Sequence, residues 1–221
     1  MRVILAEKPS VAQSIAAVLG ADQKKNGYLQ GENDLVSWCI GHLIELAPPE
    51  IYDARYAKWR REDLPIVPSA WESVVSDGTK KQFAVLKDLL NRTDVDEVVC
   101  ATDAGREGEL IFRMAYEKTG CTKPVKRLWI SSLEESVIRE GFRSLKPGTA
   151  YDALYRAALC REQADWLVGI NGTRLYSRLY GTKLNVGRVM TPTLAMVVQR
   201  EKEIAAFQVE RFYTVQLSCG F

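Results

Sequence analysis

EVVCATDAGREGELIFRMAYEK, residues 97–118, contains the change of pattern that decides the fold. Residues 97–102 are mostly apolar and rich in valine, which is typical of a short buried strand. Residues 109–118 carry apolar side chains at helical spacing ahead of Gly120, and they predict a helix. The polar loop 103–109 between them holds three carboxylates and two glycines. A buried strand that leads into a helix is the unit from which parallel sheets are built.

The segments on either side repeat this alternation. We expect further strands over 3–6, 27–30, 35–40 and 125–130, and helices over 9–20, 80–90 and 132–145. Ser132 and Glu135 have the spacing of a capping box, which would start the last of these helices. Residues 47–78 are irregular in pattern, with four prolines, and read as an ordered excursion over the surface. The order predicts an α/β fold, a sheet with a parallel core and helices on both faces.

The pattern becomes helical beyond Pro147-Gly148. We expect a helix over 151–180 and another over 191–206, with Thr191 as its N-cap and Pro192 at its first position. Residues 209–221 read as a strand without a domain of its own. The chain is therefore expected to be a fragment, with one domain over 1–148, a helical part of a second over 149–208, and the truncated start of another over 209–221.

Composition limits the classes of protein that fit. With 47% hydrophobic and 26% charged residues in 221, the chain can form a core without disulfides or structural zinc. Its apolar runs are too short to cross a bilayer, and no signal peptide is recognisable. Five isolated cysteines read as buried free thiols of a reducing cytosol. The net charge of +2 argues against a strongly basic nucleic-acid binder, but residues 151–221 hold nine Lys/Arg against six Asp/Glu.

Charged side chains follow two of the predicted strands. Glu7 and Lys8 come after the first strand, and Asp103 and Glu107 come after strand 97–102. Ligands of α/β sheets bind at the carboxyl ends of strands, where these carboxylates would supply oxygen ligands for Mg²⁺ and Lys8 a charge for a phosphate. Gly105 and Gly108 would let the loop turn tightly. Taken alone, each piece also fits an ordinary solvated turn.

Five segments together resemble type IA DNA topoisomerases, specifically the topoisomerase III kind. EKPSVAQSIAAVLG (7–20) and ATDAGREGELIFR (101–113) are similar to the two signature segments of a Toprim domain. Three further segments match that family in their order along the chain and in their residues: WCIGHLIELAPPEIYDARYAKWRREDLPIVP (38–68), REQADWLVGINGTRLYS (161–177) and NVGRVMTPTL (185–194). The resemblance implies a Toprim Rossmann-like sheet followed by a helical segment of a DNA-binding domain.

The resemblance also implies roles for the strand-end residues. Glu7 would be a general acid or base and a metal neighbour, Lys8 would hold the scissile phosphate, and Arg106 would orient the carboxylates or contact DNA. Glu7, Asp103 and Glu107 would bind Mg²⁺. Gly105 stands where the family's metal motif has a middle aspartate, so we expect one weakly held Mg²⁺. Glu109 matches a further acidic position of unassigned role.

The later segments imply a groove for single-stranded DNA. The resemblance places Arg161, Asp165, Asn185, Arg188 and Thr191 in that groove. Asn185 replaces a common serine and Met190 a common glutamine, so a polar contact at residue 190 is not expected. The N-terminus of the helix after Arg188 is also a phosphate site on physical grounds.

Two smaller features stay open between roles. Tyr176 and Tyr180 fit either ordinary half-buried helix aromatics or base-stacking groups. His42 fits either a structural histidine or a residue near the active-site cleft.

Type IA enzymes cut and reseal one DNA strand through a 5′-phosphotyrosyl intermediate. None of the nine tyrosines here lies in the family's nucleophile motif, so we expect this chain to be inactive alone. The resemblance implies single-stranded DNA as partner, a helicase or single-strand-binding protein in the full-length context, and a cytoplasmic, nucleoid-associated enzyme without a membrane segment. Two alternatives stay open: another Toprim phosphoryl-transfer enzyme, such as a primase or nuclease, and a non-catalytic nucleic-acid-binding or protein-interaction module.

Overall fold

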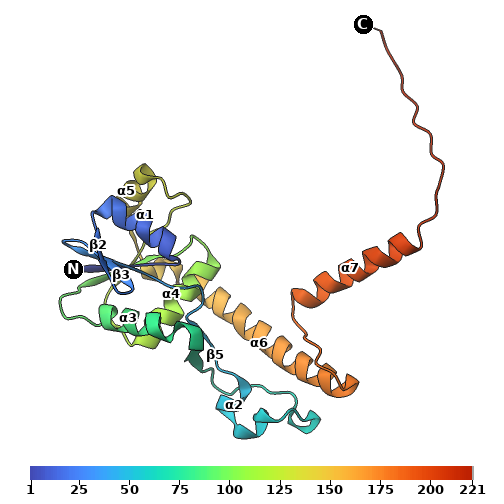
Figure 1. Cartoon of the computed structure of the whole chain (residues 1–221), viewed down its shortest axis with the longest axis horizontal. Helices are drawn as coiled ribbons and strands as arrows, with labels where there is room; N and C mark the ends of the chain where they lie inside the picture. Colours follow the sequence, from blue (N-terminus) through green and yellow to red (C-terminus); the bar gives the residue numbers. More distant parts are fainter. Residues whose placement is uncertain (221) are drawn as a thin grey trace.

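A seven-stranded sheet with helices on both faces forms the body of the protein in the computed structural model, which describes residues 1–220 (Figure 1). The strand order is β2-β3-β4-β1-β7-β8-β9. The strands span Gln23–Lys25, Tyr28–Gln30, Asp34–Trp38, Arg2–Ala6, Glu97–Ala101, Val125–Arg127 and Lys146–Pro147 in that order. The β4, β1, β7 and β8 strands run parallel, and the outer three pair antiparallel. The predicted α/β fold with a parallel core is confirmed.

Alternate residues of the central strands bury themselves on opposite faces. Val3 and Leu5 of β1 pack toward α3 (Lys80–Leu90) and α4 (Arg106–Thr119), whereas Ile4 and Ala6 pack toward α1 (Pro9–Leu19) and α5 (Glu135–Arg143). All four of these β1 side chains are fully buried. The sheet is therefore covered on both sides, which explains why its central strands read as continuous apolar runs.

The excursion, residues 47–78, is ordered as expected, and it carries short elements that the sequence did not predict. It contains a short helix α2 (Pro49–Tyr52), a strand β6 (Ser73–Val75) that pairs antiparallel with β5 (Ile44–Leu46), and single 3₁₀ turns at Ala54–Ala57, Arg61–Asp63 and Asp77–Thr79. This two-stranded sheet was not predicted from the sequence, because strands of three residues are too short to show an alternation of apolar and polar side chains.

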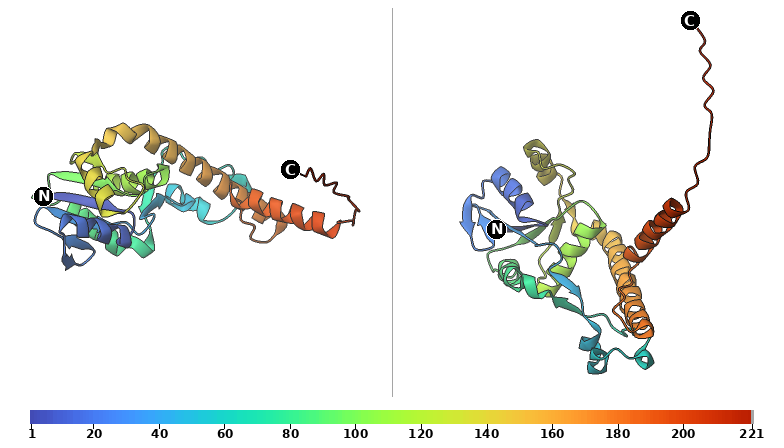
Figure 2. Two further views of the ribbon diagram at one scale, coloured as in Figure 1. Left: turned by 90° about the horizontal axis from the view of Figure 1, so that it is seen from above. Right: turned by 45° about the vertical axis from the view of Figure 1, so that its right-hand side comes forward.

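The helical arm consists of α6 (Asp152–Tyr180), reached through the 3₁₀ turn Gly148–Tyr151, and α7 (Met190–Ala205). The first part of α6 packs on α4, and its far part runs beside the excursion, away from the sheet (Figures 1 and 2). The excursion fastens this far part: the Asn171 side chain exchanges hydrogen bonds with both main-chain groups of Ile66, at 2.6 and 2.9 Å. The Trp166 indole donates to the Ala47 carbonyl at 3.0 Å.

Several boundaries differ from the sequence expectations. Helix α5 begins at Glu135, because Ser132 Oγ accepts a hydrogen bond from the Glu134 amide in a turn before the helix and caps nothing. Helix α4 begins at Arg106, three residues earlier than expected, and thus takes in most of the acidic loop. Strand β2 was missed because its three side chains are all polar and exposed.

The end of the described chain also corrects an expectation. Helix α7 begins at Met190 after Val189, so Thr191 is the second residue of the helix and not its N-cap. Residues 207–220 form no helix or strand, since a strand needs a partner and nothing in the described part of the chain pairs with them. The proposed boundary at residue 148 falls directly after β9, whose last residue is Pro147.

The cysteine expectation holds for three residues of five. Cys39, Cys100 and Cys121 are buried free thiols, whereas Cys160 on α6 and Cys219 are exposed. Burial raises the pKa of the Cys100 thiol to about 11. Cys160 was mispredicted because it lies on a face of α6 that the described chain leaves uncovered.

Candidate active site and nucleic-acid-binding helix

The parallel pairing of β1 and β7 brings the two charged strand ends together. Ala6 pairs with Ala101 at the last rung, so the chain leaves both strands at the same edge. Glu7 Oε2 accepts a hydrogen bond from the Asp103 amide at 3.2 Å, and Lys8 Nζ lies 3.9 Å from Asp103 Oδ2. The side chains of Lys8 and Asp103 are each 58% exposed, so both are open to a ligand from solvent.

Glu107 reaches the same edge from the first turn of α4, where the positive end of the helix dipole favours a carboxylate. Its Oε1 lies 2.8 Å from His42 Nε2, and His42 follows β4. His42 therefore lies beside the predicted acids, as the resemblance implied. The Arg106 side chain is exposed and makes no hydrogen bond or salt bridge within residues 1–220. We call Glu7, Lys8, Asp103 and Glu107 the strand-end site.

The donor chemistry of the strand-end site fits a hard cation such as Mg²⁺. Glu7, Asp103 and Glu107 offer carboxylate oxygens at one edge, the ligands that Mg²⁺ prefers. The three are not drawn together: residues 1–220 contain no group of three or more His, Cys, Asp or Glu side chains placed closely enough to hold a metal ion. Each carboxylate instead has its own partner, an amide, a lysine or a histidine. Mg²⁺ usually retains several waters, so it does not require a closed protein cage.

The two loop glycines play different parts from those predicted. Gly105 has φ −179°, an extended conformation that any residue adopts, and a Cβ there would meet open space. A Cβ on Gly108 would lie 2.2 Å from the Asp103 carbonyl oxygen. Gly108 is therefore needed for close packing of α4 on the strand end, while the tight-turn role proposed for Gly105 is wrong.

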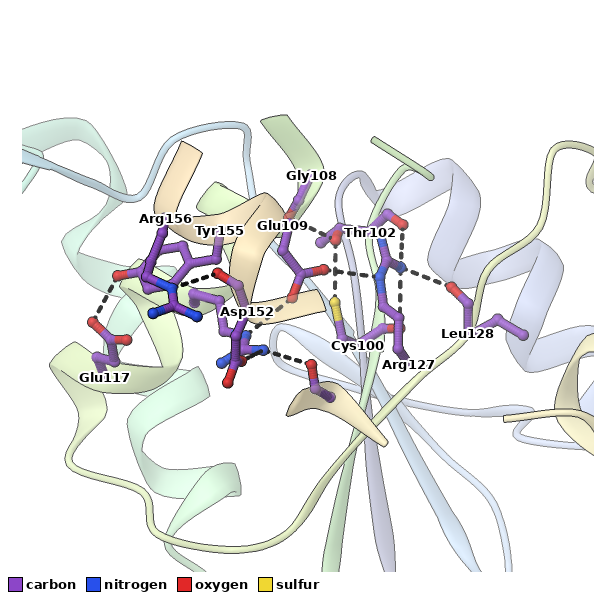
Figure 3. A network of polar contacts seen from close by, with 12 residues as sticks. Cys100, Thr102, Gly108, Glu109, Glu117, Arg127, Leu128, Asp152, Tyr155 and Arg156 are labelled. Atoms are coloured by element: carbon purple, nitrogen blue, oxygen red, sulfur yellow. Dashed lines mark hydrogen bonds and ion pairs between the residues drawn. The ribbon is translucent and has the colours of Figure 1, made fainter. Parts of the chain in front are cut away.

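Glu109 does not face the strand-end site. Its side chain is 1% exposed and forms ion pairs with Arg113 and Arg127, both at 3.0 Å (Figure 3). Arg127 is itself fully buried. The sequence reading missed both arginines; for Arg127 the available signal was its charge within the predicted strand 125–130.

The helical arm gathers three of the five predicted DNA-binding residues. Asp165 on α6 accepts a two-pronged contact from Arg188 and lies 3.8 Å from Arg161, measured from Oδ2 to Nε. The hydrogen bond from Arg188 lowers the pKa of Asp165. The side chains of Arg161, Asp165 and Arg188 are 40–44% exposed.

The other two predicted residues lie close by in different settings. Asn185 lines a hollow of about 520 Å³ between α6 and the excursion, together with Asp165, Trp59 and Trp166. Thr191 Oγ1 accepts a hydrogen bond from the Gly187 amide at 3.0 Å, which closes the turn before α7. Met190 is 49% exposed, and Tyr176 and Tyr180 stack on each other with ring centroids 6.4 Å apart and their sides open to solvent.

None of the helices in the described part of the chain has the length and apolar character needed to span a membrane.

Comparisons with known proteins agree with this architecture. The chain is 50% identical over 214 residues to a protein named DNA topoisomerase 3 from Bacillus thuringiensis (strain Al Hakam), covering 97% of this chain and 29% of the relative. It is 49% identical over 216 residues to the protein of that name from Staphylococcus epidermidis, covering 98% of this chain and 30% of the relative. The chain thus spans about 30% of the length of these relatives.

A solved structure gives the same result for the fold. Full-length topoisomerase I from Thermotoga maritima superposes with a TM-score of 0.64 at 26% identity, covering 93% of this chain and 31% of that one. A family profile described as DNA topoisomerase matches residues 149–221. The Toprim domain profile matches residues 2–133, which carry the whole strand-end site, and this shows that the chain belongs to the Toprim family.

Proposed function

We propose that this chain is the acidic, metal-binding part of a type IA DNA topoisomerase of the topoisomerase III kind, which cuts and reseals one DNA strand. The observation that carries the proposal is that the β1–β7 pairing brings Glu7, Lys8 and Asp103 to one sheet edge, with Glu107 in the first turn of the adjoining helix α4. The relatives named DNA topoisomerase 3, at about 50% identity over nearly the whole chain, support this choice among Toprim enzymes.

The proposed reaction is a transfer between two phosphodiesters. A tyrosine hydroxyl attacks the scissile phosphorus, a new P–O bond to the tyrosine forms at the 5′ side, and the bond to the 3′ oxygen breaks. The tyrosine hydroxyl releases its proton to water as it attacks. Glu7 gives a proton to the departing 3′ oxygen, and both transfers are reversed on resealing. Lys8 and Arg106 offset charge on the phosphate oxygens. No tyrosine of this chain is assigned as the nucleophile, so we propose that it comes from another part of a longer protein.

We further propose that Glu7, Asp103 and Glu107 hold one Mg²⁺. When bound, this ion would offset phosphate charge and orient the substrate. Asp103→Asn should then weaken Mg²⁺ binding by about tenfold, whereas Gly105→Asp should strengthen it, because space for a fourth carboxylate is open at that position. Calorimetric Mg²⁺ titration of the two variants measures both effects. Equal affinity in the wild type and Asp103→Asn would contradict the ligand set.

Single-stranded DNA is the proposed partner of the helical arm. Arg161 and Arg188 would contact phosphates, Asn185 and Thr191 would donate or accept hydrogen bonds, and Asp165 would hold Arg188 in place. In the cell we propose a cytoplasmic, nucleoid-associated enzyme that works beside a helicase or a single-strand-binding protein. We also propose the division into a Toprim domain over 1–148, a helical part over 149–208 and a further domain from 209.

A plasmid relaxation assay tests the proposal. A full-length protein that contains this chain should relax negatively supercoiled plasmid with Mg²⁺ and form a covalent adduct with single-stranded DNA. Glu7→Ala should lower the relaxation rate by at least 100-fold without changing the melting temperature. The 221-residue chain alone should not relax DNA. Full activity of Glu7→Ala, or relaxation by the 221-residue chain alone, would overturn the proposal.

A further inference from the structure

Arg127 at the end of β8 is the most completely enclosed charged side chain near the strand-end site (Figure 3). Its guanidinium donates from Nε to Glu109 Oε2 at 3.0 Å. The two terminal nitrogens donate to four main-chain carbonyls at 2.7–3.3 Å, those of Cys100, Thr102, Asp103 and Leu128. The aromatic rings of Trp129 and Tyr151 stack 4.8 Å apart and lie within 6.0 Å of the guanidinium.

Two of these bonds hold the main chain from which the Asp103 carboxylate projects. Arg127 Nη1 binds the Thr102 carbonyl and Nη2 the Asp103 carbonyl, both at 2.8 Å. On the other side, Thr102 Oγ1 donates to the Gly108 carbonyl at 2.7 Å, and Gly108 packs directly on Asp103. The end of β7 is therefore fixed between a buried guanidinium and the first turn of α4.

Arg113 provides a natural comparison, because it binds the same glutamate from the opposite side. Its Nε donates to Glu109 Oε1 at 3.0 Å, and its Nη2 donates to the Gly148 carbonyl and to Asp152 Oδ1, both at 2.7 Å. It makes no hydrogen bond to residues 102–103 within the described chain. Arg113 thus shares the charge and the partner of Arg127 without touching the strand-end site.

We propose that Arg127 is a positioning residue for Asp103, and that Glu109 is the buried counterion of Arg127 and not a member of the metal-binding acids. This inference rests on the proposed function of Asp103 as a ligand. A guanidinium can reach four carbonyls and a carboxylate at once because its five donors are spread over three nitrogens, whereas a lysine has three donors on a single nitrogen. Glu109 is required because an unpaired cation is not stable in a buried site.

The test compares Arg127→Lys with the matched control Arg113→Lys in the 221-residue chain. Amide order parameters from NMR report the rigidity of residues 103–105, with residues 98–100 of β7 as an internal reference. In Arg127→Lys we expect values for 103–105 to fall from about 0.85 to below about 0.6 while the reference stays rigid. We expect Mg²⁺ affinity to fall by about tenfold, in the range usual for residues that orient metal ligands. Arg113→Lys should leave the order parameters of 103–105 at about 0.85 and the Mg²⁺ affinity within twofold of the wild type.

A purely structural role for Arg127 predicts a different result. Each lysine variant would then lower the free energy of unfolding, but neither the local order parameters nor the Mg²⁺ affinity of the folded protein would distinguish Arg127→Lys from Arg113→Lys. That outcome would overturn the inference. If Arg127→Lys does not fold, Glu109→Gln takes its place in the experiment. This variant removes the negative charge of the counterion at nearly constant shape, and it should lower the order parameters of residues 103–105 relative to those of residues 98–100. Unchanged order at 103–105 in that variant would overturn the inference as well.

The order parameters also separate this inference from the proposed function. Absence of Mg²⁺ binding by the wild-type chain would count against the proposed metal site, whereas the local order of 103–105 would still decide the role of Arg127.

Discussion

The strand-end site and the helical arm carry their charged residues in opposite ways. At the strand-end site the side chains of Lys8 and Asp103 are exposed, but the main chain behind Asp103 is fixed by Arg127, which is buried together with its partner Glu109. On the helical arm, Arg161, Asp165 and Arg188 are all partly exposed, and the contacts among them are salt bridges at the surface. A reacting phosphate requires acids at defined positions, whereas a flexible DNA strand can be held by side chains that adjust.

The largest test of this difference is Gly108→Ala. The added methyl group would lie 2.2 Å from the Asp103 carbonyl oxygen, so α4 must move away from the strand end. We expect the free energy of unfolding to fall by about 3 kcal/mol, the upper part of the usual range for overpacking. Urea denaturation measures this, with Gly105→Ala as control because its Cβ meets open space. A loss at Gly108 no larger than that at Gly105 would show that the strand end is not tightly packed.

The second test breaks the attachment of the arm. Asn171→Ala removes both hydrogen bonds to Ile66 and leaves the main-chain groups of that buried residue without these partners. We expect a loss of about 2 kcal/mol. Urea denaturation measures this loss, and calorimetric titration of the same variant should show no change in Mg²⁺ affinity. A parallel loss of Mg²⁺ binding would mean that the arm and the strand-end site are not independent.

Arg188→Ala should leave the thermal unfolding midpoint unchanged, because its only partner in the described chain, Asp165, is itself exposed. It should weaken binding of a single-stranded oligonucleotide and lower the slope of log affinity against log salt by about 1. Fluorescence anisotropy at several salt concentrations measures this. Arg200→Ala on the exposed end of α7 serves as control, and an equal loss there would indicate non-specific attraction.

The smallest expected effect is a change in pH dependence at Glu162 on α6. Burial raises the pKa of Glu162, and the nearby charges of Glu107 and Glu45 add to it, while His42 acts in the opposite direction. A raised carboxyl pKa favours the folded state at low pH, and this contribution is lost as the pH rises through the folded-state value. Glu162→Gln should therefore raise the free energy of unfolding at pH 7 by less than about 1 kcal/mol after solvent screening, and should not raise it at pH 4; urea denaturation at the two pH values measures this. Equal shifts at both pH values would show that titration of Glu162 is not the cause.

The sequence predicted the strand-end site better than its surroundings. Glu7 and Asp103 could be placed together because consecutive strand–helix units form a parallel sheet, which fixes where the strands end. The role of Arg127 could not be predicted, because it depends on hydrogen bonds to four main-chain carbonyl groups, and the sequence of side chains does not show where these carbonyls lie. Strand β6 and the start of α5 were mispredicted for a related reason, because both depend on tertiary partners. Strand β6 is too short to show an alternating pattern, and Ser132 hydrogen-bonds within a turn before α5.

The length of α6 has a mechanical consequence. Its 29 residues extend over about 44 Å, so a tilt of about 5° at its base would carry its far end through about 4 Å. The base is held by Arg113 and Asp152, and the far part is held by Asn171 and Ile66. The excursion thus supports α6 at a second point along its length. The far end of α6 can therefore move only as far as the excursion itself deforms.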